Sequence, residues 1–216
     1  MSNPLPTVYV VDDDSSVRKS LARLLRSVGH TPETFASPET FLEHCRQTPV
    51  RGCALLDVRM PGISGLEFQK VLIEASLRLP VIFITGYGDI SMSVMAMKSG
   101  AIEFLTKPFH EQSLLDAVNA GIERDRTRRQ EAKNVLELQR RFELLTPRER
   151  EIFSLVVTGR PNKQIAAQLK LSELTVKVHR SQVTKKMQAT SIIELARMAD
   201  RLGLSAEISH PPKPKQ

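Results

Sequence analysis

Polar side chains that suit phosphoryl chemistry stand directly after four short apolar runs of this 216-residue chain. The acidic pair Asp12 and Asp13 follows the first run, and Asp57, Thr85 and Lys107 follow the other three. If the runs are parallel strands, their carboxyl ends share one edge of a sheet, where open α/β sheets bind ligands. Two acids, a lone carboxylate, a hydroxyl and an amine are the groups needed to move a phosphoryl group onto a carboxylate.

Each of these groups has a separate part in that chemistry. Clustered carboxylates repel one another, so Asp12 and Asp13 favour a hard divalent cation with oxygen ligands, such as Mg²⁺. Asp57 is then an ionised nucleophile that forms an acyl phosphate. The Thr85 hydroxyl and the Lys107 ammonium are suited, together with Mg²⁺, to offset the charge that develops on the phosphoryl oxygens.

The first 120 residues alternate strand-like runs with amphipathic helical segments. Apolar residues recur at helical spacing after each strand, and the helices have stop signals at Gly29 and Gly100 and a cap at Ser37. Five such alternations predict an α/β doubly wound, five-stranded parallel sheet. The strands are expected at residues 8–11, 31–35, 53–56, 81–84 and 102–105.

A charged segment follows the fifth strand and helix. Residues 121–143 lack proline and consist mostly of good helix formers, and we expect charged groups such as Asp125 and Arg128 on a solvated surface. Apolar residues recur every three or four positions from Val135 to Leu145. This pattern favours a long linker helix that continues the fifth helix; the alternative is a flexible tether.

The remaining residues have the pattern of four short helices. Thr146 and Glu149 predict a capping box at the first of them, and Ser191 and Glu194 predict another at the last. The middle two are joined by a three-residue turn, as in a helix-turn-helix unit. The predicted parts of the chain are an α/β domain at 1–120, a helical linker at 121–143, a helix-turn-helix domain at 144–204 and a disordered tail at 205–216.

Charge is distributed unevenly along the chain. Residues 1–120 carry 11 Lys/Arg and 13 Asp/Glu, a net charge of −2, whereas residues 121–216 carry 20 and 11, a net charge of +9. The basic part predicts a polyanionic partner such as DNA. We find no long apolar span and no signal peptide, so we expect no membrane partner and a cytoplasmic protein. Cys45 and Cys53 lack metal-ligand spacing and are expected to be buried or half-buried thiols.

Residues 7–120 resemble the receiver domain of bacterial response regulators, which has a flavodoxin-like fold. The matching motifs are Val10-Val11-Asp12-Asp13-Asp14, Leu56-Asp57-Val58-Arg59-Met60-Pro61-Gly62, Ile84-Thr85-Gly86 and Lys107-Pro108-Phe109. The resemblance implies that Asp57 is the phosphoacceptor.

The same resemblance assigns roles to the residues around Asp57. It implies that Asp13, Asp57 and the backbone carbonyl of Arg59 bind Mg²⁺, with Asp12 reaching the ion through water. Lys107 would contact the phosphoryl group, and the Lys107–Pro108 peptide would be cis. Thr85 and Phe104 occupy the positions of the conformational switch; Phe104 lacks the hydroxyl of the tyrosine that many relatives have there.

Residues 144–203 resemble the helix-turn-helix domain of the NarL/FixJ (LuxR-type) family. The matching stretches are residues 145–151, 162–166 and 171–172 and Thr175-Val176-Lys177-Val178-His179-Arg180. Two residues depart from the family pattern: Pro161 precedes Asn162, and Gln188 stands where relatives often have glycine.

Helical spacing from Glu173 places Val176, Val183 and Met187 on one inward face. An outward face of basic, hydroxyl and small apolar groups suits the major groove of DNA. That face comprises Lys177, Val178, Arg180, Ser181, Thr184 and Lys185. Further candidates for phosphate contact are Lys186 and, near helix N-termini, Thr146, Arg148 and Lys163.

Together these features predict a regulator that is not an enzyme. A sensor histidine kinase would phosphorylate Asp57, a surface at residues 91–104 would form a homodimer, and the paired helix-turn-helix domains would bind promoter DNA. RNA polymerase is a further candidate partner. Two alternatives remain: a receiver that only drains phosphoryl groups from a kinase, and a DNA-binding protein that does not depend on phosphorylation.

Overall fold

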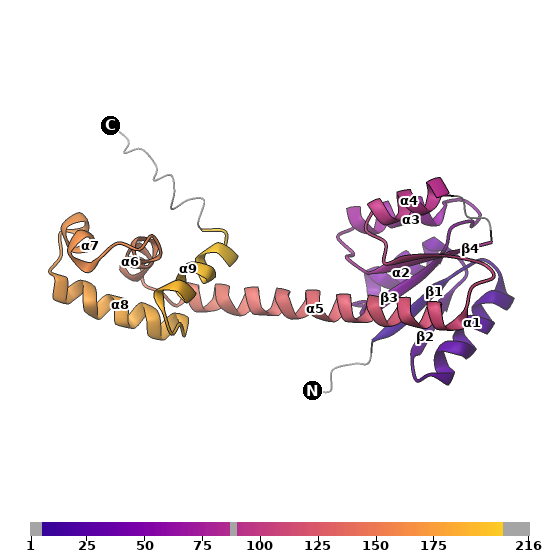
Figure 1. Cartoon of the computed structure of the whole chain (residues 1–216), viewed down its shortest axis with the longest axis horizontal. Helices are drawn as coiled ribbons and strands as arrows, with labels where there is room; N and C mark the ends of the chain where they lie inside the picture. Colours follow the sequence, from indigo (N-terminus) through magenta and orange to yellow (C-terminus); the bar gives the residue numbers. More distant parts are fainter. Residues whose placement is uncertain (1–5, 87–89, 205–216) are drawn as a thin grey trace. The chain divides into compact units, whose positions relative to one another are not determined.

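The computed structural model describes residues 6–86 and 90–204 and divides into two compact units, Met1–Arg129 and Gln130–Gln216 (Figure 1). The tail expected to be disordered, 205–216, lies outside the described residues. The strands of the first unit are β1 (Thr7–Val11), β2 (Thr31–Phe35), β3 (Gly52–Asp57), β4 (Val81–Thr85) and β5 (Glu103–Thr106). Its helices are α1 (Ser15–Ser27), α2 (Pro38–Gln47), α3 (Gly65–Glu74), α4 (Ile90–Lys98) and the first part of α5 (Glu111–Glu143).

The strands form one parallel sheet in the order β2-β1-β3-β4-β5, which confirms the predicted doubly wound fold. Every residue of β3 and β4 is buried, as expected for central strands that are covered on both faces. On one face α2, α3 and α4 pack around Phe41 and Phe68; on the other, α1 and α5 pack around Leu25 and Leu114 (Figure 1).

The edge strand β5 departs from its prediction by one residue at each end. It was expected at 102–105 and spans Glu103–Thr106, where it pairs with β4 alone. An edge strand is covered less than a central one, and the β5 side chains are exposed or half-buried. Its apolar pattern is therefore weak, and the boundaries drawn from that pattern are less accurate.

Helix α5 confirms the predicted linker helix, because it runs from Glu111 to Glu143 without a break. In the first unit it lies close against β3. A Cβ atom added at Gly121 would stand 2.9 Å from the Cβ atom of Cys53, so glycine at this position permits the close approach. Cys45 and Cys53 are buried free thiols, as predicted.

The charged start of the linker is not the solvated surface that the sequence predicts. The side chain of Asp125 is buried and accepts hydrogen bonds from the Gly52 backbone N–H at 2.9 Å and from Arg129 Nε at 2.6 Å. It also pairs with Arg128, while Arg129 donates to the Val50 carbonyl. This cluster, the Asp125 clamp, fastens α5 to the start of β3. Gly52 and Asp125 lie more than seventy positions apart in the sequence, so no local sequence pattern indicates this contact.

The second unit contains the four predicted helices, α6 (Pro147–Val157), α7 (Asn162–Leu169), α8 (Glu173–Met187) and α9 (Ile192–Arg201). Thr146 and Glu149 form the expected capping box at α6. At α9 the prediction is half wrong: Ser191 accepts the Glu194 N–H, but the Glu194 carboxylate accepts the N–H and hydroxyl of Thr190 instead of closing a box with Ser191. Between α7 and α8, Lys170 turns the chain with a positive φ of 53°.

Candidate functional site

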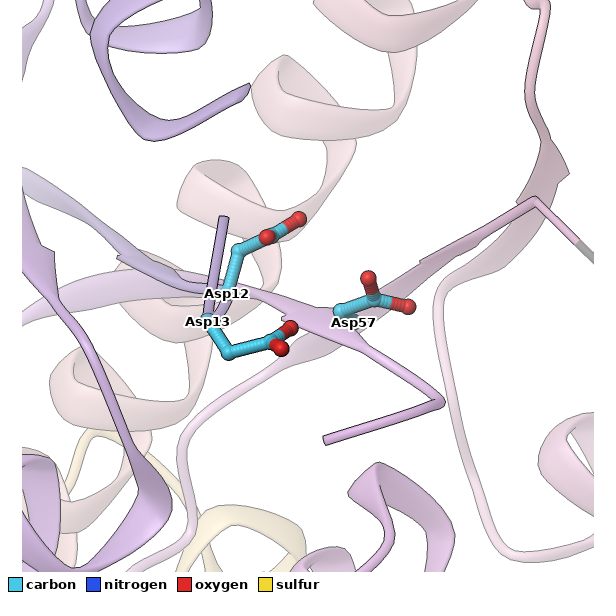
Figure 2. Close-up of side chains that lie close together, drawn as sticks. All are labelled: Asp12, Asp13 and Asp57. Atoms are coloured by element: carbon cyan, nitrogen blue, oxygen red, sulfur yellow. The ribbon is translucent and has the colours of Figure 1, made fainter. Parts of the chain in front are cut away.

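The three acidic residues expected at the carboxyl edge of the sheet lie together. Figure 2 shows Asp12 and Asp13 at the end of β1 beside Asp57 at the end of β3, and one carboxylate oxygen from each lies within 4.8 Å of the others. Asp12 and Asp57 are buried, whereas Asp13 is exposed. Because β1 and β3 are adjacent and parallel, the pairing itself brings the three side chains to one edge.

Local hydrogen bonds hold the loops of the pocket in place. Asp12 Oδ1 accepts the Asp14 N–H at 2.8 Å, and the Asp14 side chain caps α1 by accepting from Ser16. Asp57 Oδ1 accepts the Arg59 N–H at 3.2 Å. Behind the loop after β3, a Cβ atom added at Gly65 would stand 2.3 Å from the Asp57 carbonyl oxygen, so this position requires glycine.

Lys107 joins the two buried acids of the pocket. Its Nζ lies 3.0 Å from Asp12 Oδ2 and 3.3 Å from Asp57 Oδ2. The Lys107 N–H donates to the Thr85 carbonyl at 2.7 Å, and the peptide to Pro108 is cis, as the resemblance implied. The ammonium therefore lies against both carboxylates.

For both Asp57 and Lys107, burial shifts the pKa in one direction and the oppositely charged partner shifts it in the other. Burial raises the pKa of Asp57 and outweighs the Arg59 hydrogen bond and the attraction of Lys107. Burial opposes the charge of Lys107 as well, but hydrogen bonds and attraction from Asp12 and Asp57 outweigh it and raise the pKa of Lys107. A divalent cation at the acids would favour the ionised form of Asp57 that nucleophilic attack requires.

The two residues expected to form the switch, Thr85 and Phe104, lie on the neighbouring strands β4 and β5. Thr85 is fully buried and ends β4, where it is paired with Thr106 of β5. Phe104 is half-buried, and its ring centroid lies 6.3 Å from that of Phe83. Phe104 therefore packs at the edge of the hydrophobic core that contains Phe83.

In the second unit, the inward face of α8 is as predicted, with Val176, Val183 and Met187 buried. The outward face needs one correction, because Arg180 and Thr184 are half-buried rather than exposed. Arg180 Nη1 donates to Asn162 Oδ1 at 2.6 Å, so this guanidinium connects α8 to α7. The exposed members of the face are Lys177, Val178, Ser181 and Lys185.

The other basic candidates fall into two groups. Lys163, in the first turn of α7, is exposed, as is the Thr146 cap of α6. Arg148, by contrast, is held by Glu151 at 2.5 Å and by the Leu169 carbonyl at 2.7 Å.

Lys186 also has protein partners: its Nζ lies 2.6 Å from the buried carboxylate of Glu149 and 3.2 Å from the Leu144 carbonyl. The local sequence predicts the part that Glu149 takes in the capping box. It does not predict the ion pair between Glu149 and Lys186, which lie 37 positions apart in the chain. Lys186 thus connects α8 to the start of α6.

An acidic pocket closed by a lysine lies at the carboxyl edge of a parallel five-stranded sheet, and a helix-turn-helix unit follows it in the chain. This combination defines a receiver domain joined to a helix-turn-helix domain. Comparison with known families agrees: residues 8–119 match the response regulator receiver domain, and residues 143–199 match the bacterial regulatory proteins of the luxR family. The chain belongs to the response regulators with a LuxR-type DNA-binding domain, a family of transcriptional regulators rather than of classical enzymes.

Curated relatives match over nearly their whole length. The chain is 51% identical to Nodulation protein W of Bradyrhizobium diazoefficiens, over 92% of this chain and 87% of the relative. It is 43% identical to the transcriptional regulatory protein FixJ of Azorhizobium caulinodans, over 95% of this chain and 96% of the relative. Among solved structures, the response regulator StyR matches with a TM-score of 0.79 and 48% identity, over 92% of this chain and 100% of StyR.

The family also bears on the ligands of the two units. Receiver domains generally bind Mg²⁺ at their acidic pocket, and three clustered carboxylates with hard oxygen atoms suit that ion. A receiver domain implies a sensor kinase partner, and a LuxR-type domain implies DNA binding. No helix in the described parts of the chain is long and apolar enough to cross a membrane.

Proposed function

We propose that this protein is a phosphorylation-controlled transcriptional regulator, in which a sensor histidine kinase phosphorylates Asp57 and thereby promotes dimerisation and promoter binding. The observation that carries the proposal is the pocket in which Lys107 bridges Asp12 and Asp57. A half-buried ammonium placed between two acids at the end of a sheet contributes little to core packing. It is well placed to receive the oxygens of a phosphoryl group.

In the proposed transfer, a carboxylate oxygen of Asp57 attacks phosphorus, a P–O bond forms, and the P–N bond to the kinase histidine breaks. Asp13, Asp57 and the Arg59 carbonyl would hold Mg²⁺, with Asp12 contributing through water, and the ion would neutralise charge and orient the phosphoryl group. Lys107 then exchanges its contact with Asp57 for a phosphoryl oxygen.

The proposed switch follows from the same exchange of contacts. Thr85 would donate its hydroxyl to the phosphoryl group, and Phe104 would move inward beside Phe83 into the space that this shift leaves. Phosphorylation can bias the receiver only if the phosphoryl group stabilises the active conformation more than the resting one.

The proposed dimer surface lies on α4 and β5. Four apolar side chains of α4 are exposed, although α4 packs on the sheet through Ala96. An exposed apolar cluster of this kind favours a partner, and a second copy of the chain fits the proposed pairing of DNA-binding units. The exposed side chains are Ile90, Val94, Met95 and Met97.

For the DNA interface we propose two kinds of contact. Lys177, Val178 and Ser181 would meet base edges in the major groove, while Lys185, Lys163 and Thr146 would contact phosphates. Arg148, Arg180, Thr184 and Lys186 would mainly support this surface, with their remaining donors available to the backbone. Promoter binding of this kind would also bring the protein close to RNA polymerase.

DNA binding and molar mass by light scattering, with and without Mg²⁺ and a small phosphodonor, test the proposal for wild type and Asp57→Ala. We expect donor-induced dimerisation and tighter binding in the wild type alone. Equal binding by both proteins, unaffected by the donor, would favour a phosphorylation-independent regulator. Phosphorylation without salt-dependent binding to any duplex would favour a phosphate sink.

A further inference from the structure

One exposed apolar side chain of the second unit has no part in the proposed function. Leu174, in the first turn of α8, is 72% exposed, the highest value for a large apolar side chain among the described residues of that unit. Single apolar side chains are common on protein surfaces, so exposure alone does not assign a role to Leu174. The direction in which it points and the residues beside it do.

The buried face of α8 fixes the direction of Leu174. Val176 and Val183 are fully buried in the core of the second unit, which sets the rotation of α8 about its own axis. Leu174 stands two positions before Val176, a rotation of roughly 200° about the helix axis, and therefore points away from that core. The Ser172 hydroxyl caps this turn by accepting the Thr175 N–H at 3.0 Å, so Leu174 belongs to a well-formed first turn.

Leu174 is the first member of a strip along the outward face of α8. Positions 174, 178, 181 and 185 are four, three and four residues apart, the spacing of neighbours on one face of a helix. The strip begins with the apolar side chains of Leu174 and Val178, which are 72% and 53% exposed. It continues with the exposed polar side chains of Ser181 and Lys185. The two apolar side chains thus form one pair at the start of the strip.

The charges around the strip favour DNA as its partner. Lys177 and Lys185 are exposed on this face, and residues 121–216 carry 20 Lys/Arg and 11 Asp/Glu, a net charge of +9. In helix-turn-helix units, the N-terminal part of the second helix contacts base edges in the major groove. Glu173, exposed in the same turn as Leu174, would repel a phosphate group, so this turn suits base edges better than the sugar-phosphate backbone.

The major groove offers one apolar group to such a pair. Donors and acceptors cover the base edges there, apart from the C5-methyl group of thymine, which makes apolar contacts with protein side chains. The same methyl group is present on 5-methylcytosine and absent from cytosine and uracil. An apolar pair at the start of α8 therefore suits pyrimidines that carry this methyl group.

We propose that Leu174 is a specificity-determining residue that contacts the C5-methyl group of a pyrimidine, close to a second methylated pyrimidine that Val178 contacts. The inference rests on the proposed DNA binding by α8 and adds the chemical group that this part of the helix recognises. Because the methyl group is the feature recognised, methylation of a cytosine at the Leu174 position strengthens binding.

DNA sites that differ by one methyl group test the proposal. A duplex that binds the full-length protein, in the presence of Mg²⁺ and a small phosphodonor, is first selected from a random library. Each thymidine is then replaced in turn by deoxyuridine, which lacks only the C5-methyl group. We expect the replacement to weaken wild-type binding about fourfold at each of at least two nearby positions, the value expected for one buried methyl group. Fluorescence anisotropy at fixed salt measures the affinities.

Matched variants assign one of these methyl groups to Leu174. In Leu174→Ser, the effect of deoxyuridine should disappear at one position and persist at the other. Leu174→Met keeps an apolar side chain and should retain both effects. Leu144→Ser, at a leucine of the second unit that is 67% exposed and lies outside α8, should also retain both. The proposal is overturned if Leu174→Ser keeps both effects, which would leave Leu174 for a protein partner.

The reverse change, adding a methyl group, gives an independent readout. With cytosine at the Leu174 position, 5-methylation should tighten wild-type binding about fourfold and leave Leu174→Ser unchanged. Equal binding of the methylated and unmethylated sites by the wild type would contradict the proposal. If the wild type selects no sequence at all, the proposed function fails and this inference fails with it. Sequence-specific binding without dependence on any methyl group overturns this inference alone.

Discussion

In the acidic pocket, one lysine stabilises an arrangement of carboxylates that would otherwise repel. Lys107 Nζ contacts Asp12 Oδ2 and Asp57 Oδ2, so the ammonium occupies oxygens that a divalent cation also needs. Lys107 and a bound Mg²⁺ would therefore compete for the same carboxylates. The contact also holds the lysine close to the place where the phosphoryl group would arrive.

Lys107→Met should therefore bind Mg²⁺ about tenfold more tightly than the wild type, because the cation no longer works against a like charge. The same variant should retain less phosphoryl group after treatment with a small phosphodonor. Calorimetry and mass spectrometry measure the two effects. Lys98→Met, at an exposed lysine at the end of α4, is the control, and an unchanged Mg²⁺ affinity in Lys107→Met would contradict the expectation.

A second residue pair makes the stability of the DNA-binding unit depend on pH. Burial opposes the charge of Glu149, but hydrogen bonds from Lys186 and Thr146 outweigh it and lower the pKa of Glu149. A carboxylate with a lowered folded pKa stabilises the fold above its unfolded pKa, about 4.3 for glutamate, and this stability is lost as the pH falls through the folded pKa.

Glu149→Gln should lower the free energy of unfolding of the second unit by about 2 kcal/mol at pH 7, since Lys186 loses a charged partner while the capping geometry is kept. The difference between variant and wild type should shrink as the pH falls below about 4. Urea unfolding followed at several pH values measures both. A difference that stays constant with pH would show that the charge of Glu149 does not matter.

At the scale of elements, the sequence predicts most of the fold because its signals are local. Ser37 caps α2 and Thr146 caps α6 as expected, since a cap depends on residues only three positions apart. The central strands are clear for the same reason: β3 and β4 are continuous apolar runs. The acidic pocket follows from them, because parallel strands bring their ends to one edge.

The features that the sequence does not reveal are contacts between distant segments. Asp125 looks like one more charge of a solvated helix, yet it is buried against Gly52. Lys186 resembles a phosphate-binding lysine, yet it is paired with Glu149. In each case the partner's position depends on the packing of whole helices, which local periodicity does not encode.

The ends of α7 and α8 carry a strain that substitution can test. Lys170 and Gln188 both adopt a left-handed conformation, with φ of 53° and 56°, which favours glycine. Gln188→Gly should raise the free energy of unfolding of the second unit by about 0.5–1 kcal/mol. Gln182→Gly, at an exposed position inside α8, should lower it by about 1 kcal/mol. Chemical unfolding compares the two, and destabilisation by Gln188→Gly would contradict this account.

For the molecule as a whole, DNA binding should depend strongly on salt because the second half of the chain carries its net positive charge. Lys163→Gln should reduce the slope of log K against log salt by about one for each DNA-binding unit that contacts the duplex, with little change in sequence preference. Fluorescence anisotropy over a range of salt concentrations measures the slope. Lys133→Gln, at an exposed lysine of α5, is the control and should leave the slope unchanged.

The Asp125 clamp has a consequence for how the chain would be digested. It fastens α5 as far as Arg129, and the next buried residue of the helix is Leu138. Residues 130–137 between them are exposed apart from half-buried Val135, and a helical stretch so short has little stability of its own in water. Local opening there would admit a protease without unfolding either core. Brief trypsin treatment should therefore cut first at Lys133 and release two folded fragments.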